Sequence, residues 1–186
     1  MDQESKDSWK EFFTEFYQKY SRPFWLYIFK ICGDENLAED IFQESFLRFL
    51  KAEPVIVSVI HLRSYLYKIA FRLIIDKKRK IKVENRVFED RKKALKENLY
   101  TESRENRTHI SEEMEKTFQL LKPKERILLW LAYVEGYSYK EIGEITKCKE
   151  NSVKVKVFNA RKKFAGLLRE KRQEKGEKIW EKGFVI

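Results

Sequence analysis

Apolar residues recur at helical rather than strand spacing through the first half of the chain. Capping signals open the predicted helices, and glycine and the residues around proline close them. These signals place a break at Ser21–Pro23. We therefore predict helices over residues 8–20, 24–32, 34–51 and 61–80. The apolar segment 55–60 is either a strand-like loop or an apolar plug.

The second half of the chain begins with a segment of different character. Residues 82–112 contain few apolar positions and mix charges of both signs, so we predict a linker between two domains. A proline in the first turn predicts a helix over 123–136, with Val134 on its apolar stripe. A capping box then predicts a short helix over 138–145, followed by a turn at 146–149.

Residues 151–164, NSVKVKVFNARKKF, begin with valines and lysines in alternation, which is typical of a strand. The alternation stops after Val157, whereas a helical register continues over four turns. In that register six apolar residues form one stripe: Val153, Val157, Ala160, Phe164, Leu167 and Leu168. We therefore predict a helix, and Val155 then points away from the core.

An outward valine among polar and basic residues suits the major groove of DNA. Lysine and arginine neutralise phosphates, asparagine can pair with adenine, and an exposed methyl group can contact the thymine methyl. With the short helix and turn before it, this helix predicts a helix-turn-helix with residues 150–164 as the recognition helix. The candidate DNA contacts are Ser152, Lys154, Val155, Lys156, Asn159, Arg161 and Lys163. The alternative is a plain helical hairpin with a solvated basic face.

Two further stripes lie on the predicted helices of the first half. An acidic stripe with one apolar residue suits a basic protein surface or is an ordinary solvated face: Asp40, Gln43, Glu44 and Leu47. A second stripe combines aromatic and basic side chains, as surfaces that hold unpaired bases do: His61, Tyr65, Lys68, Arg72 and Arg79. The alternative is that Tyr65 is a boundary residue and His61 belongs to a loop.

Composition supports an all-α protein that binds a polyanion. Among 186 residues only 6 are Gly and 3 are Pro, and the formal net charge is +10. A lysine-rich solvated surface is the alternative. The longest apolar run is too short to span a bilayer, and the polar amino terminus shows no secretory signal, so we expect a cytoplasmic protein without membrane insertion.

The inventory of reactive residues predicts neither enzyme activity nor a cofactor. Two cysteines and two histidines do not make a disulfide scaffold or a metal set, and no phosphate-binding glycine loop or catalytic triad is visible. We expect no catalytic residue, no metal and no cofactor. Cys148, in the predicted turn, is interpreted as a small buried filler rather than a redox group.

Three segments together resemble a known family. Residues 121–164 are similar to region 4 of bacterial sigma factors of the extracytoplasmic-function (ECF) type, with their Pro-started helix, capped helix and basic recognition helix. Residues 38–51 resemble the polymerase-binding helix of region 2, and residues 62–80 resemble the helix of that region that engages the −10 element. The segments follow the family's order.

The resemblance implies an all-α protein of two small helical domains joined by a linker. Its expected parts are a region 2-like domain, a linker, a region 4-like helix-turn-helix domain and a tail: 1–81, 82–112, 113–172 and 173–186. The implied function is a transcription initiation factor that binds core RNA polymerase, directs it to promoters and helps open the DNA. The recognition helix would read the −35 element, the aromatic and basic stripe would hold the −10 strand, and the acidic stripe would contact polymerase.

The resemblance also implies an inhibitory anti-sigma factor as a partner, besides core polymerase and promoter DNA. It further implies a linker that passes through the polymerase. A helix-turn-helix regulator that acts without being a polymerase subunit is the alternative, with the first half then serving dimerisation or sensing.

Overall fold

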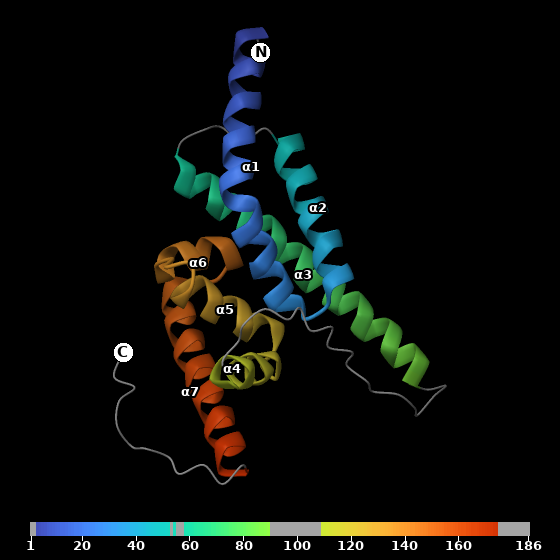
Figure 1. The fold of residues 1–186 in the computed structure, drawn as a ribbon, viewed down its shortest axis with the longest axis vertical. Helices are drawn as coiled ribbons and strands as arrows, with labels where there is room; N and C mark the ends of the chain where they lie inside the picture. The colour runs from blue at the N-terminus through green and yellow to red at the C-terminus, as the bar shows by residue number, and fades with distance from the viewer. Residues whose placement is uncertain (1–2, 53, 55–57, 90–108, 175–186) are drawn as a thin grey trace. The chain divides into compact units, whose positions relative to one another are not determined.

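The protein is described from a computed structural model, which covers residues 3–52, 54, 58–89 and 109–174. These residues form helices and contain no strand, so the prediction of an all-α protein is confirmed. The chain divides into two compact units, residues 1–98 and 99–186. The first contains α1 (Gln3–Cys32), α2 (Glu35–Ala52) and α3 (Val59–Glu89). The second contains α4 (His109–Gln119), α5 (Pro123–Tyr133), α6 (Tyr139–Thr146) and α7 (Glu150–Glu174), as Figure 1 shows.

The first helix contradicts the predicted break. The structure has one continuous α1, with Pro23 inside it, where we expected two helices over residues 8–20 and 24–32. A proline inside a helix costs about 3 kcal/mol because it removes a backbone donor and its ring crowds the preceding turn. Large aromatic side chains on both sides of the proline, among them Phe16 and Phe24, are buried on one face of α1. Burial of each aromatic side chain contributes about 1.5–3 kcal/mol. Both sides of α1 bury their rings on one face only if the helix continues through Pro23, so this burial offsets the cost of the proline.

Aromatic rings from all three helices meet in the core of the first unit. The Phe49 ring of α2 stacks on Phe16 of α1, with centroids 5.4 Å apart and planes at 6°. Phe24 meets Phe46 and Tyr67 edge-on, with centroids 5.5 Å and 5.3 Å away. Edge-to-face and offset pairs are the favoured arrangements of aromatic rings, so these contacts fix the three helices against each other.

Caps define the starts of α2 and α3. Asp34 Oδ1 accepts a 2.7 Å hydrogen bond from the Leu37 amide, which confirms the predicted N-cap of α2. Ser58 Oγ accepts a bond from the His61 amide at 3.2 Å, so α3 starts at Val59, before the predicted start at residue 61. The same helix continues to Glu89, beyond the predicted end at residue 80.

The boundaries predicted for the linker stay a prediction. α3 enters the 82–112 segment and α4 begins within it, whereas residues 90–108 lie outside the described part of the chain. The same holds for residues 55–57 of the apolar segment and for the tail beyond residue 174. The domain limits expected from the sequence are therefore part of the proposal below.

The helix-turn-helix of the second unit forms as predicted. In the capping box before α6, Ser138 Oγ accepts a bond from the Glu141 amide at 3.3 Å, and Glu141 Oε2 accepts one from the Ser138 amide at 2.8 Å. Lys147, with φ 55°, ends α6 in the left-handed conformation. A Cβ on Gly143 would lie 2.6 Å from the Cys148 carbonyl oxygen, so only glycine fits where the turn folds back onto α6.

The helical interpretation of residues 151–164 is confirmed. α7 buries Val153, Val157 and Ala160, all at 2% exposure or less, against its own unit. Phe164 follows on the same side, with its ring 6.1 Å from Phe118 of α4. The expected burial of Val134 is wrong: α5 ends at Tyr133, and Val134 is 61% exposed.

Candidate nucleic-acid interface

The outward face of α7 is exposed as the sequence predicted. Val155 is 58% exposed, although Val153 and Val157 on either side of it are almost fully buried. The other six candidates on this helix are exposed too: Ser152, Lys154, Lys156, Asn159, Arg161 and Lys163. The buried apolar side of α7 fixes the orientation of the helix, so the opposite side presents amide, ammonium and methyl groups outward. These groups together can contact both phosphates and base edges.

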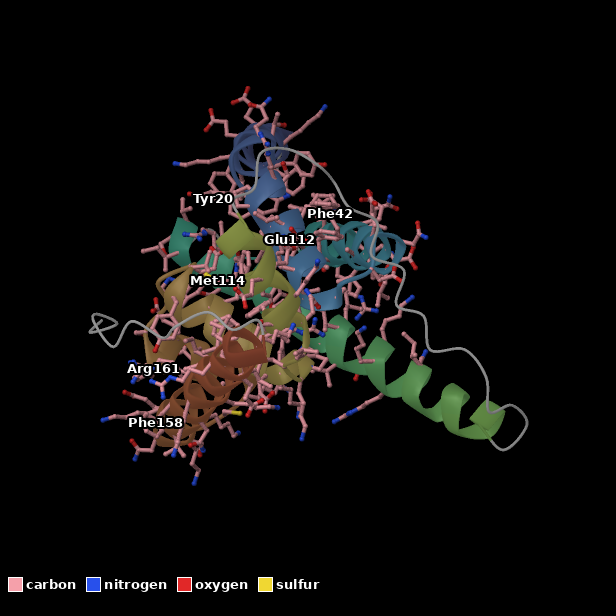
Figure 2. The ribbon with its side chains drawn as sticks, turned by 60° about the horizontal axis from the view of Figure 1, so that its bottom comes forward. Tyr20, Phe42, Glu112, Met114, Phe158 and Arg161 are labelled. Atoms are coloured by element: carbon pink, nitrogen blue, oxygen red, sulfur yellow. The ribbon has the colours of Figure 1, made fainter. Side chains whose placement is uncertain are left out.

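Phe158 belongs to this face, and the sequence analysis missed it. Its side chain is 55% exposed, and the Arg161 guanidinium carbon lies 6.0 Å from its ring centroid. Figure 2 shows both residues on α7. Phe158 lies three positions after Val155, so helical spacing places the two on the same side. That spacing was the available signal, but a phenylalanine beside Val157 is easily assigned to the core.

Lys163 is not a free cation on this face. Its Nζ forms a 2.9 Å ion pair with Glu125 Oε2 of α5, which also accepts a 2.7 Å bond from the Lys122 amide. Partial burial acts to raise the pKa of Glu125, but the hydrogen bonds from Lys163 and Lys122 and their charges outweigh it, so the pKa lies below its ordinary value. The structure therefore places Lys163 at the junction of α5 and α7.

Cys148 is half-buried rather than a fully buried filler, which corrects the interpretation from sequence. Lys156 Nζ donates to its Sγ at 3.3 Å. Partial burial acts to raise the pKa of the thiol, but its hydrogen bonds and the charge of Lys156 outweigh it, so the pKa lies below its ordinary value. One of the candidate phosphate-binding lysines is thus held against the turn.

The aromatic and basic stripe lies along α3, and we call its five predicted residues the α3 stripe. His61, Arg72 and Arg79 are exposed, whereas Tyr65 and Lys68 are half-buried. His61 Nδ1 lies 2.7 Å from Ser58 Oγ, so its ring is tied to the start of the helix. The Tyr65 ring is 6.0 Å from that of Phe49, so part of it belongs to the core boundary. The exposed part of the α3 stripe therefore presents one aromatic ring edge and several cationic side chains.

In the acidic stripe on α2, Asp40, Gln43 and Leu47 are exposed and Glu44 is half-buried, and the polar members already carry internal partners. Asp40 Oδ2 lies 3.5 Å from Lys77 Nζ of α3, Glu44 Oε1 lies 2.6 Å from Arg48 Nε, and the Gln43 amide donates to Glu39 at 2.8 Å. Leu47 is 51% exposed. Exposed pairs of this kind exchange readily with a partner's charges because each contributes little, about 0–1 kcal/mol.

The described residues lack two kinds of feature. They contain no group of three or more His, Cys, Asp or Glu side chains that could hold a metal ion. No described helix is long and apolar enough to cross a bilayer.

Comparisons with known proteins match both units. The family model described as "Sigma-70 region 2" matches residues 16–83, and the model described as "Sigma-70, region 4" matches residues 111–164. The "ECF RNA polymerase sigma factor SigM" of Bacillus subtilis (strain 168) is 29% identical over 161 residues, covering 82% of this chain and 93% of the relative. The solved structure of the sigma factor RpoE from Bartonella quintana, in complex with the anti-sigma factor NepR, covers 86% of this chain and 98% of its own, with a TM-score of 0.69 and 19% identity.

Proposed function

This chain belongs to the sigma-70 family, as a factor of the ECF type that directs RNA polymerase to promoters, and we propose which of its surfaces perform each part of that task. The region 2 match covers α2 and most of α3, and the region 4 match covers the helix-turn-helix. The proposed parts are the region 2-like domain, the linker, the region 4-like domain and the tail, over 1–81, 82–112, 113–172 and 173–186.

In this proposal α7 reads the −35 element in the major groove. The observation that carries it is the exposed Val155 between two buried valines, on a helix whose outward face also presents amide and cationic side chains and the ring of Phe158. Lys154 and Arg161 bind phosphates, and Lys156 does so when its ammonium group leaves Cys148 Sγ. Asn159 and Val155 meet base edges. Ser152 lies near the helix start as a further polar contact, and Lys163 acts at the edge of the site because Glu125 holds it.

The first unit is proposed to hold the opened −10 strand and the polymerase. The α3 stripe offers Tyr65 and His61 for stacking against unpaired bases, with Lys68, Arg72 and Arg79 for the backbone. The acidic stripe on α2, Asp40, Gln43, Glu44 and Leu47, is proposed to bind a basic surface of core polymerase. The two stripes lie on adjacent helices of one unit, so polymerase binding and strand binding occur side by side.

The proposed partners are core RNA polymerase, promoter DNA and an anti-sigma factor, as the NepR complex of the RpoE relative suggests. We further propose that the chain performs no catalytic step, uses no cofactor and works in the cytoplasm, where core polymerase is found.

Transcription in vitro with core polymerase tests the proposal. The full-length chain is expected to direct initiation at a subset of genomic promoters, and Asp40→Lys is expected to abolish this by repelling the basic surface. The same variant should bind duplex promoter DNA with unchanged affinity, because α7 is in the other unit. Specific DNA binding without any initiation or polymerase binding would instead favour a regulator that acts alone.

A further inference from the structure

The apolar stripe of α7 continues beyond the point where the rest of the unit covers it. Ala160 is 2% exposed, whereas Phe164, Leu167 and Leu168, which follow on the same stripe, are only half-buried. The helix itself runs on to Glu174, and Figure 1 shows its end reaching past α4. Apolar surface left in water costs about 25 cal/mol per Å², so the distal half of α7 has an apolar side that lacks full cover.

α4 extends this apolar surface. Its half-buried Phe118 ring lies 6.1 Å from the ring of Phe164, centroid to centroid. Met114 lies four residues before Phe118, hence on the same side of α4, and is 42% exposed. Figure 2 labels Met114 on this helix. We call Met114, Phe118, Phe164, Leu167 and Leu168 the α4–α7 face.

The sequence that follows α7 is rich in large apolar residues. Residues 177–186 read EKIWEKGFVI, and half of them are of this kind: Ile179, Trp180, Phe184, Val185 and Ile186. Gly176 comes two positions after Glu174, the last residue of α7, where a glycine commonly ends a helix and turns the chain back. This segment therefore combines a turn signal with apolar side chains to cover a neighbouring surface.

The segment is long enough to reach the α4–α7 face. Leu168 lies six residues before Glu174, which is about 9 Å along the helix axis. Six residues also separate Glu174 from Trp180, and an extended chain of that length spans up to about 20 Å. A chain that turns back at the end of α7 thus brings Trp180 alongside Leu168 and Phe164.

Charge also suits this segment. Lys171 lies three residues after Leu168, on the same side of α7, and is half-buried. It forms no ion pair with any residue in the part of the chain that the structure describes. The segment carries Glu177 and Glu181 on either side of its first apolar pair, so one of these carboxylates can pair with Lys171.

We propose that residues 177–186 fold back on α7 and cover the α4–α7 face, with Trp180 against Leu168, Phe164 and Met114. The occupant is the chain's own segment because its covalent attachment gives an effective concentration of about millimolar, which a second copy or a separate partner lacks. The α4–α7 face lies on the side of α7 opposite Val155, so the covered state leaves the DNA-binding face free. The inference does not depend on the proposed function.

Methyl NMR of the full-length chain tests the contact directly. The sequence has only two methionines, so methyl-labelled methionine gives one signal for Met1 and one for Met114, which Met114→Leu assigns. We expect a nuclear Overhauser effect between the Met114 methyl group and the indole protons of Trp180. Trp180→Ala should abolish this effect and shift the Met114 signal.

Cleavage by trypsin after Lys178 and Lys182 provides a second measurement. Trp180→Ala keeps both cleavage sites but removes the largest apolar side chain of the segment. We expect both sites to be cut faster by about tenfold or more, because cleavage follows the population of the open segment. Tyr133→Ala removes a 53% exposed aromatic ring at the end of α5 and should behave as the wild type in both measurements.

The outcomes decide what covers the α4–α7 face. A Met114 signal and cleavage rates that do not change in Trp180→Ala would overturn the inference. It would also be overturned if the contact appears only between differently labelled copies and grows with concentration, which would make a second copy the occupant. A Met114 signal that ignores Trp180→Ala and shifts only when core polymerase is added would assign the face to a separate partner instead.

Discussion

Asn159 and Lys154 are both exposed on α7, yet their chemistry gives them different effects on DNA binding. An asparagine amide can form two hydrogen bonds with adenine, so its loss should affect one base pair of the site. A lysine ammonium group contacts phosphate, which every sequence carries.

We therefore predict that Asn159→Ala reduces discrimination at one −35 position by about 1–3 kcal/mol. Lys154→Gln should instead weaken all duplexes alike and reduce the salt slope by about 0.9. Binding of the full-length chain to a panel of singly substituted −35 duplexes, repeated at several salt concentrations, measures both quantities. Equal losses on every duplex for Asn159→Ala would show that this amide does not read a base.

Helical spacing was sufficient to identify the exposed side of α7 but not the partners of its lysines. The period of the apolar stripe fixed which side of the helix is buried, and Val155 was correctly placed outside. Lys163 was predicted as a DNA contact from its position on α7. Its ion-pair partner Glu125 lies 38 residues away in sequence, so the pattern along α7 gave no sign of the pair. Lys156 likewise reaches Cys148 across the turn. Contacts between helices depend on packing, which a residue pattern along one helix does not contain.

At the scale of helices, α7 and α1 show when local signals succeed. In α7 a short alternation competed with a longer helical stripe, and the longer pattern predicted the element correctly. In α1 the signals at Ser21–Pro23 were real but were outweighed by aromatic packing on both sides. Starts marked by a side-chain bond, such as those of Asp34 and Ser138, were predicted well because the cap itself lies in the sequence.

Replacing Pro23 tests that account of α1. Pro23 is exposed, so Pro23→Ala leaves no cavity and restores a backbone donor inside the helix. We expect the first unit to gain about 1–3 kcal/mol in the free energy of unfolding, because a helix gain of about 3 kcal/mol is reduced by greater freedom of the unfolded chain. Urea titration followed by circular dichroism measures this gain. Arg22→Ala, at the preceding exposed position, is the control and should change stability little. A loss of stability in Pro23→Ala would show that the proline does not cost the helix free energy.

The Glu125–Lys163 ion pair predicts a pH-dependent link between α5 and α7. Because the folded pKa of Glu125 is lowered, its charged form contributes stability above the unfolded pKa, and that contribution is lost as pH falls through the folded pKa. Glu125→Gln keeps an acceptor for the Lys122 amide but removes the charge. We expect it to be less stable than the wild type by at most about 1 kcal/mol at neutral pH, since both partners are partly exposed.

Thermal unfolding of both proteins between neutral pH and acid checks this sign. The two midpoints should approach each other as pH falls through the lowered folded pKa of Glu125, because the wild-type carboxyl is then protonated as well. Glu144→Gln, an exposed residue of α6, provides a matched control that should show no such convergence. A constant difference between wild type and Glu125→Gln at all pH values would mean that the charge is not what joins the two helices.

At the scale of the whole molecule, two units with separate cores each carry a different proposed reader of DNA. The resemblance of the two halves to two family regions was visible in the sequence because each half contains its own helix signals. The contact between Arg63 of α3 and the Tyr20 ring of α1 was not visible, since the two residues meet only after the first unit folds.

Dividing the chain between residues 98 and 99 tests whether the units depend on each other. Each fragment is expected to fold, with the second binding −35 duplex and the first binding core polymerase, because each buries its own apolar residues. Initiation at promoters that need both elements should fall sharply when the fragments are mixed, since a covalent connection supplies an effective concentration of about millimolar. Run-off transcription against fragment concentration measures the loss, and full activity of the mixture at micromolar levels would show that the connection contributes nothing to promoter recognition.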